Sequence, residues 1–333
     1  MYITSVSFQL HRPPFISVFS HQAMEEDKPW ALDSEVGGEF GYLEEQADIL
    51  RHFQIISHRD LLQNPELHGP KIQALLMWKY CPTAEPALLG LLPSLKVVAS
   101  GGVGTDHLDV DATADFAMGL LLASAREILE GHQIAMDPNT VHIPQSLMGV
   151  EVTGSTLGII GMGDIGYKIA QRSFGFEMKI LYHNRTRRSV EDERAVRGSY
   201  CERLDDLLRR SDFVVVAVKL TSRTTGLIGR RELSLMKPSA TLVNISRGQV
   251  VDQDALVEAL QSGGIRAAAL DVTHPEPLPR DHPLLGLPNV LITPHIGTNT
   301  NNTARAMVER MVENALAAVK GLPVPNEVRS QSQ

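Results

Sequence analysis

The sequence lacks several features that mark particular classes of protein. Its 333 residues include only two cysteines, Cys81 and Cys201, which excludes a disulfide-rich scaffold and a cysteine-built zinc site and predicts a reducing, cytoplasmic compartment. The longest apolar run, residues 116–123, is far shorter than the ~18 residues of a membrane-spanning helix, so no membrane partner is expected. Basic residues number 31 against 39 acidic ones, a formal net charge of −8, which disfavours nucleic acid as a partner.

The length and composition predict a folded protein of two domains. Hydrophobic residues make up 43% of the chain and charged residues 21%, which are globular proportions, and the chain is too long for one ordinary core. The first 24 residues contain no Asp or Glu, and Pro13 and Pro14 interrupt any helix there. We therefore expect a disordered extension over residues 1–29, one domain over residues 30–110 with 302–333, and a second domain over residues 111–301.

Short apolar runs alternate with segments of helical periodicity from residue 53 onward. This alternation is typical of parallel strands joined by crossover helices, so the fold class is predicted to be α/β, with a doubly wound parallel sheet in each domain. Buried strands are expected at residues 53–57, 72–77 and 95–100 in the first part, and at 157–161, 178–184, 213–218, 240–246, 265–272 and 289–293 in the second.

Apolar residues at helical spacing predict two long helices. One covers residues 111–129 and is expected to be buried. The other covers residues 302–320, ends before Gly321 and Pro323, and could return to the first domain. Residues 137–145 lack periodicity and contain two prolines, which predicts a loop.

A glycine pattern follows the first strand of the second series. Gly161, Gly163 and Gly166 form GMGDIG directly after LGII and directly before the helical segment YKIAQRSF. The first glycine permits a tight turn, the second admits a pyrophosphate, and the third lets the helix pack on the strand, while the helix N-terminus favours the anion. We expect these glycines, with Asp164 and Ile165 between them, to bind a dinucleotide; the alternative is an ordinary strand-to-helix turn.

The end of the next strand bears on which dinucleotide is bound. An NAD site usually places Asp or Glu there to bond the ribose 2′-hydroxyl, whereas this chain continues with Asn184, Arg185, Thr186, Arg187 and Arg188. Guanidinium groups match the geometry of a phosphate. The pattern therefore favours NADP(H) over NAD(H), with Asn184 to Arg187 as cofactor contacts, against the alternative of a solvated basic loop.

Three polar residues, Arg247, Glu276 and His295, each follow a predicted strand. Ligands of an open α/β sheet bind beyond the carboxyl ends of the strands, so these side chains can converge on one crevice. Hydride transfer to a carbonyl needs a proton donor and a fixed cation. An imidazole held by a carboxylate can supply the proton, and a guanidinium can bind a substrate carboxylate. From the pattern alone, a histidine after a strand is more often structural, and Arg and Glu in loops are more often solvated.

Four segments together carry a resemblance to a known family, and they are GMGDIG, NISRGQVVDQDALVEAL, LDVTHPEPLPRDHPLL and TPHIG. They are similar to the D-isomer-specific 2-hydroxyacid dehydrogenases, and the PEPLP and HPLL stretches resemble the glyoxylate/hydroxypyruvate reductase branch. The resemblance extends from about Trp30 to Val328, and it implies a flavodoxin-like substrate domain, a Rossmann NAD(P)-binding domain, a homodimer, and NADPH-dependent reduction of small 2-oxo acids such as glyoxylate and hydroxypyruvate.

The resemblance also implies roles for individual residues. Arg247, Glu276 and His295 would form the catalytic set, with His295 as the proton donor during reduction and with Arg247 and His295 contacting the substrate. No metal site is expected. Further implied contacts are the backbone of Val103 and Gly104 with the substrate carboxylate, Asp271 and Gly297 with the cofactor, and Ile245 with the nicotinamide.

One departure from the family is visible in the sequence. Members carry a further short segment, with a hinge into the cofactor domain, between the stretches that match DHLDV and DATAD, whereas here Val110 is followed directly by Asp111. Two alternatives to an active reductase stay open, and the missing segment motivates the first of them. One is a variant that binds cofactor without turnover. The other is a non-enzymatic, dinucleotide-sensing scaffold of the transcriptional co-repressor kind, which would prefer NAD(H).

Overall fold

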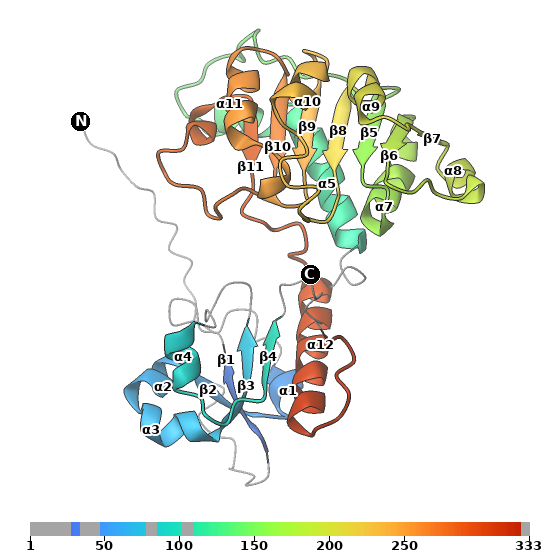
Figure 1. The fold of residues 1–333 in the computed structure, drawn as a ribbon. Coiled ribbons are helices and arrows are strands. Elements are labelled where there is room, and N and C mark those ends of the chain that lie inside the picture. The colour runs from blue at the N-terminus through green and yellow to red at the C-terminus, as the bar shows by residue number, and fades with distance from the viewer. Residues whose placement is uncertain (1–27, 34–46, 78–84, 101–109, 328–333) are drawn as a thin grey trace. The chain divides into compact units, whose positions relative to one another are not determined.

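The computed structural model describes residues 28–33, 47–77, 85–100 and 110–327, and Figure 1 draws them as a ribbon. The chain divides into two compact units, residues 1–103 with 305–333 and residues 104–304. Apart from Lys28 and Pro29, the extension expected over residues 1–29 lies outside the described part. Within the described ranges, none of the helices combines the length and apolar character that a membrane crossing needs.

The first unit contains a four-stranded parallel sheet in the order β2-β1-β3-β4. Its strands are β1 (Trp30–Asp33), β2 (Gln54–Ser57), β3 (Ile72–Met77) and β4 (Val97–Ser100). Its helices are α1 (Ala47–Leu50), α2 (His58–Gln63), α3 (Pro65–His68), α4 (Pro86–Gly90) and, from Arg305 on, α12 (Asn301–Val319).

Successive residues of β3 face opposite sides of this sheet, as the two-residue period of a strand requires. Ala74 and Leu76 pack in a core with Val308, Met311, Val312 and Ala315 of α12. Leu75 instead packs in a core with Leu61 of α2 and Leu88 of α4. The C-terminal helix thus covers one face of the N-terminal sheet, and α2 and α4 cover the other.

The second unit contains a seven-stranded parallel sheet in the order β11-β10-β9-β8-β5-β6-β7. The strands are β5 (Thr156–Ile160), β6 (Lys179–His183), β7 (Gly198–Tyr200), β8 (Phe213–Val216), β9 (Thr241–Asn244), β10 (Ala267–Leu270) and β11 (Val290–Ile292). The helices are α5 (Val110–Ala125), α6 (Ile128–Met136), α7 (Asp164–Ser173), α8 (Val190–Ala195), α9 (Leu204–Arg210), α10 (Arg230–Leu235) and α11 (Gln253–Gln261).

Helices cover both faces of the larger sheet. Leu157 and Ile159 of β5 pack in one core with residues of α5 and α7, and the neighbouring Ile160 packs in another core with residues of α9, α10 and α11. The strand order changes direction between β5 and β8, and in open α/β sheets such a switch point opens a crevice at the carboxyl ends of the strands. The predicted α/β class with doubly wound parallel sheets is confirmed.

Some elements differ from the sequence expectations. Strands β1 and β7 were not predicted, because WALD and GSY are too short and too mixed in polarity to stand out. The helix predicted over residues 111–129 is two helices, since α5 ends at Ala125, whose carbonyl accepts from the amide of Val150, and Glu127 adopts a left-handed φ of 50° before α6 begins. Residues 137–145 form a loop, as predicted.

Candidate active site

The glycine-rich turn joins β5 to α7 at the switch point of the larger sheet. Gly161 has a φ of +101°, and a Cβ there would lie 2.6 Å from the carbonyl oxygen of Ala217. A Cβ on Gly166 would lie 2.2 Å from the carbonyl oxygen of Gly161, so the start of α7 packs directly on the turn. Gly163, the N-cap of α7, faces open space and has no side-chain cap. The turn therefore leaves room and uncapped amides for an anion, as a pyrophosphate requires.

Two side chains from the end of β6 hold the turn through the peptide groups of Met162. The Met162 amide donates to Asn184 Oδ1 at 2.6 Å, and Asn184 Nδ2 donates to the Met162 carbonyl at 3.3 Å. Arg188 Nε donates to the same carbonyl at 2.7 Å. The amide of Asn184, which the sequence suggested as a cofactor contact, is thus used to fix the phosphate turn against the loop after β6.

The arginines after β6 differ in their surroundings. The side chains of Arg185 and Thr186 are exposed. Arg187 Nε and Nη2 each donate to one carboxylate oxygen of Glu193, both at 2.7 Å. Arg188 Nη1 donates to Asp192 at 3.0 Å and its Nη2 lies 3.7 Å from Asp164. Sequence reasoning missed these acidic partners, although the run of three acids in the first turn of α8 was the signal that could have revealed them.

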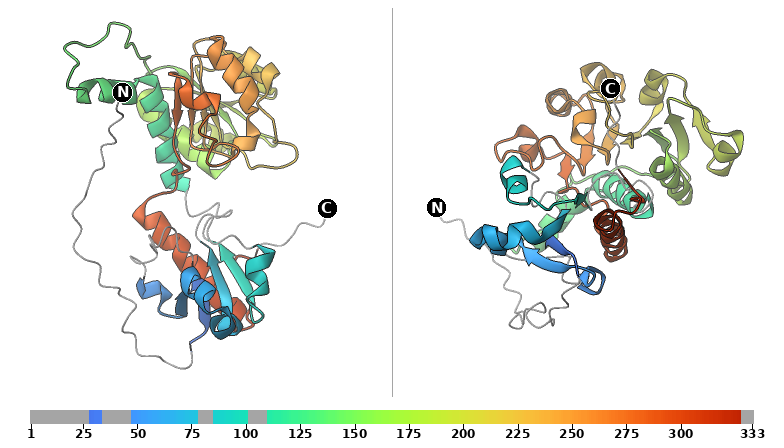
Figure 2. Two further views of the ribbon diagram at one scale, coloured as in Figure 1. Left: turned by 90° about the vertical axis from the view of Figure 1, so that its left-hand side faces the viewer. Right: turned by 60° about the horizontal axis from the view of Figure 1, so that its bottom comes forward.

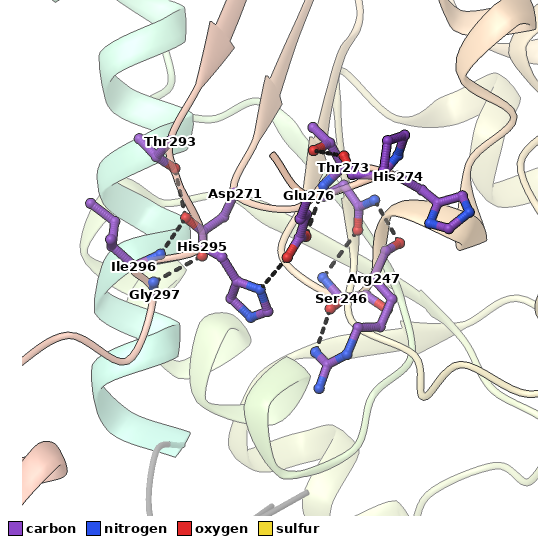
Figure 3. A network of polar contacts seen from close by, with 12 residues as sticks. Ser246, Arg247, Asp271, Thr273, His274, Glu276, Thr293, His295, Ile296 and Gly297 are labelled. Carbon is purple, nitrogen blue, oxygen red and sulfur yellow. Dashed lines mark hydrogen bonds and ion pairs between the residues drawn. The ribbon is translucent and has the colours of Figure 1, made fainter. Parts of the chain in front are cut away.

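The three predicted catalytic residues follow adjacent strands, Arg247 after β9, Glu276 after β10 and His295 after β11. His295 Nδ1 lies 2.9 Å from Glu276 Oε2, in a hydrogen bond between side chains that are 34% and 21% exposed. Figure 3 shows the side chains of His295 and Arg247 both extending away from the strands. The structure thus brings the imidazole and the carboxylate together at the edge of the sheet where the guanidinium also lies.

Backbone geometry aims the imidazole. His295 adopts a left-handed φ of 54°, which is uncommon for a residue with a side chain and requires surrounding contacts to hold it. The buried carboxylate of Asp271 supplies those contacts, since it accepts from the amides of Ile296 and Gly297 at 2.9 and 2.8 Å and from the hydroxyl of Thr293 at 2.7 Å. Asp271 and Gly297, expected to contact a cofactor, are therefore bonded to each other beside His295 (Figure 3).

Glu276 and Arg247 are held by neighbouring segments that touch each other. Glu276 Oε1 accepts from the amide of Thr273 at 3.0 Å, which leaves Oε2 for His295. The exposed side chain of Arg247 donates from Nη1 to the Ser246 carbonyl at 2.7 Å. A Cβ on Gly248, the next residue, would lie 2.0 Å from the backbone carbon of Thr273. The turn that carries Arg247 thus packs directly on the loop that carries Glu276.

The remaining predicted site residues are placed as follows. Ile245 is 8% exposed and packs in the core under α5 and α7. Asp164 and Ile165 form the first turn of α7. Val103 and Gly104 lie outside the described residues. Over the part of the chain that the structure describes, no group of three or more His, Cys, Asp or Glu side chains is arranged to hold a metal ion.

Comparisons with known proteins agree on one family. Residues 118–297 match the model for the D-isomer specific 2-hydroxyacid dehydrogenase, NAD binding domain. The chain is 42% identical to glyoxylate/hydroxypyruvate reductase B of Enterobacter sp. over 257 residues, covering 71% of this chain and 79% of that protein. It is 41% identical to a glyoxylate reductase of Thermococcus gammatolerans over 262 residues, covering 72% and 78%. The 71% of this chain that is aligned contains fewer residues than the 257 of the alignment. The Enterobacter protein therefore has residues in the aligned region that this chain lacks.

Solved structures support the same assignment. D-lactate dehydrogenase of Aquifex aeolicus, complexed with NAD and lactic acid, superposes with a TM-score of 0.72 at 26% identity, covering 87% of this chain and 96% of that one. The NAD-complexed D-isomer specific 2-hydroxyacid dehydrogenase of Lactobacillus delbrueckii gives a TM-score of 0.71 at 25% identity, covering 90% and 100%. The chain therefore belongs to the D-isomer-specific 2-hydroxyacid dehydrogenase family.

Proposed function

We propose that this protein reduces small 2-oxo acids, such as glyoxylate and hydroxypyruvate, to 2-hydroxy acids with NADPH. The observation that carries the proposal is the 2.9 Å hydrogen bond between His295 and Glu276 at the sheet edge where Arg247 also lies. The relatives named glyoxylate reductase and glyoxylate/hydroxypyruvate reductase support this substrate class. The open phosphate turn at Gly163 supports a dinucleotide cofactor.

A bound nicotinamide supplies the hydride, and the protein's own residues supply the proton and hold the substrate. An ionised carboxylate only accepts hydrogen bonds, so the bond to Glu276 keeps a proton on His295 Nδ1. The proton that His295 can release to the developing alkoxide is therefore the one on Nε2, which makes the residue a general acid. Arg247 binds the carboxylate of the 2-oxo acid and stabilises the charge on its carbonyl oxygen. The family resemblance alone supports the backbone of Val103 and Gly104, which lie outside the described residues, as further contacts of the same carboxylate.

The preference for NADPH rests on the residues that follow β6. The chain has no Asp or Glu between His183 and Ser189, where an acid could bond the ribose hydroxyl. Arg185 and Thr186 are exposed there and can bind a 2′-phosphate. Replacement of Arg185 by Asp is expected to raise the Kd of NADPH relative to that of NADH. Unchanged Kd values for both cofactors would refute a phosphate contact at Arg185.

The active form is a homodimer in this proposal, and α6 with the following loop is the surface that forms it. This segment projects from the rest of the second unit (Figure 2) and carries an unusual density of exposed apolar side chains, which typically marks an interface. They are Ile128, Leu129, Met136, Val141, Ile143 and Met148. In a symmetric dimer the second copy presents the same apolar segment, so that each segment is buried against the other. Replacement of Val141 and Ile143 by Glu is expected to halve the mass measured by light scattering, and a monomeric wild-type protein would refute the dimer.

The function is tested by one steady-state experiment that crosses NADPH and NADH with several 2-oxo acids. The expected result is a loss of absorbance at the nicotinamide band that depends on glyoxylate or hydroxypyruvate and is faster with NADPH. Binding of NADPH without turnover of any 2-oxo acid would refute the reductase and support a non-catalytic chain. Faster turnover with NADH would refute only the cofactor preference.

A further inference from the structure

The loop after β6 is less basic than its sequence suggests, because acids from two helices neutralise two of its arginines. Glu193 binds Arg187 through both carboxylate oxygens, and Arg188 lies between Asp192 and Asp164. Ion pairs of this kind cancel the long-range field of each cation. Arg185 is the remaining guanidinium of the loop, and its side chain is exposed.

The carboxylate of Glu193 is held firmly as an anion. It is 9% exposed, and Tyr182, which is fully buried, donates its hydroxyl to Oε1 at 2.6 Å. The hydrogen bonds from Arg187 and Tyr182 lower the pKa of Glu193 from its ordinary value of 4.5 to about 2. The first turn of α8, which carries Glu193, is capped, because the Asp192 amide donates to the hydroxyl of the N-cap residue Ser189 at 3.1 Å. Glu193 is therefore a fixed, ionised partner at neutral pH.

The guanidinium of Arg187 nevertheless remains at the surface, next to the predicted ribose site. Its side chain is 58% exposed, and its guanidinium carbon lies 5.6 Å from the ring centre of Tyr200. The pair with Glu193 uses Nε and Nη2 of the guanidinium, which is one of the two donor pairs through which an arginine binds a phosphate in a bidentate contact. Binding of a phosphate by Arg187 in this way therefore competes with Glu193.

We propose that Glu193 is a specificity-determining residue, which withholds Arg187 from the 2′-phosphate of NADPH and leaves Arg185 as the main phosphate contact. The proposal rests on the proposed function, since it concerns the cofactor of that reaction. Its consequence is that the selectivity for NADPH over NADH is lower than three free arginines would give. Removal of the Glu193 charge makes Arg187 available and raises that selectivity.

The test measures the Kd of NADPH and of NADH by nicotinamide fluorescence in three variants. Glu193→Gln keeps an acceptor for Tyr182 but loses the charge, and we expect the Kd of NADPH to fall about fivefold, the effect of one exposed ion pair of ~1 kcal/mol. The Kd of NADH should change by less than about twofold, within the scatter of a neutral surface change. Addition of Arg187→Gln should reverse the gain. The exposed Glu191 of the same helix provides the matched control, Glu191→Gln, which should not reproduce it.

Several results would overturn the proposal. It is wrong if Glu193→Gln leaves the Kd of NADPH unchanged, if it tightens both cofactors equally, or if the added Arg187→Gln has no effect. Should Glu193→Gln fail to fold, single substitutions in the otherwise unchanged protein decide. Arg185→Gln should then raise the Kd of NADPH more than Arg187→Gln does, and equal effects would refute the proposal. A wild-type preference for NADH would refute the cofactor preference stated under the proposed function. The role of Glu193 would then still be tested, because Glu193→Gln must lower the Kd of NADPH relative to that of NADH in either case.

Discussion

Replacement of Gly248 by Ala tests whether the packing of two loops sets the geometry of the catalytic residues. The added Cβ would lie 2.0 and 2.1 Å from the carbon and oxygen of Thr273 and 2.5 Å from the amide nitrogen of His274, all backbone atoms. Ordinary contact begins at 3.4 Å, so the two segments must separate by more than 1 Å. Arg247 precedes the substituted residue, and the Thr273 amide holds Glu276. A displacement of about 1 Å costs on the order of 10²-fold in rate.

The assay compares kcat for glyoxylate reduction in Gly248→Ala and in Gly286→Ala. Gly286 is the matched control, because it lies in the same unit, a Cβ there meets no atom within 4 Å, and its φ is not in the left-handed region. We expect a loss of about 100-fold in kcat for the first variant and almost none for the second. Circular dichroism and thermal unfolding verify that both are folded. A folded Gly248→Ala with kcat close to wild type would refute the reasoning.

Three further predictions concern other parts of the second unit. Gly166→Ala places a Cβ 2.2 Å from a backbone oxygen of the phosphate turn, so the Kd of both NADPH and NADH should rise, and normal binding of either would contradict the assigned turn. The side-chain amide of Gln253 bonds both the carbonyl and the amide of His274 and so holds the loop that carries Glu276. Gln253→Ala should therefore lower kcat while KM changes less, whereas Gln261→Ala on the same helix should change neither. The same change in kcat in both variants would exclude a positioning role for Gln253. Because its pKa is lowered, the ionised Glu193 stabilises the fold above pH 4.5, and this stabilisation is lost as the pH falls toward about 2. Discounted for the exposed Arg187, the contribution to the free energy of unfolding is about 1–2 kcal/mol. In Glu193→Gln the free energy of unfolding should therefore fall less steeply over that pH range than in the wild type.

The fold was predictable where burial on both faces of a strand leaves a short run of mostly apolar residues. The strand predicted at residues 72–77 has the same bounds as β3. The strands predicted at residues 213–218 and 240–246 contain β8 and β9, which are shorter by two and three residues. Strands β1 and β7 have no such run, and pairing with longer neighbours defines them. The break between α5 and α6 depends on a contact of Ala125 with Val150, which no local pattern reveals.

The candidate site was predictable to the extent that strand ends in a parallel sheet share one edge. This rule predicted that Glu276 and His295, which are 19 residues apart in the sequence, lie close together in space, and the two side chains are hydrogen bonded. The acids in the first turn of α8 indicate that the arginines have partners, but which arginine pairs with which acid depends on how α8 packs against the end of β6, and this needed coordinates. The hold that Asp271 exerts on the left-handed backbone at His295 also needed coordinates, since the sequence alone does not show a residue's φ.

The turnover of His295→Ala is the most direct test of a histidine general acid held by Glu276. NADPH oxidation with glyoxylate should fall by about 10² to 10⁴ in kcat, the range expected for loss of a general acid, while the Kd of NADPH stays close to wild type. His274→Ala, a change at an exposed residue of the neighbouring loop whose assigned bonds are backbone ones, should keep most of the activity. Turnover of His295→Ala close to the wild-type value would contradict the account.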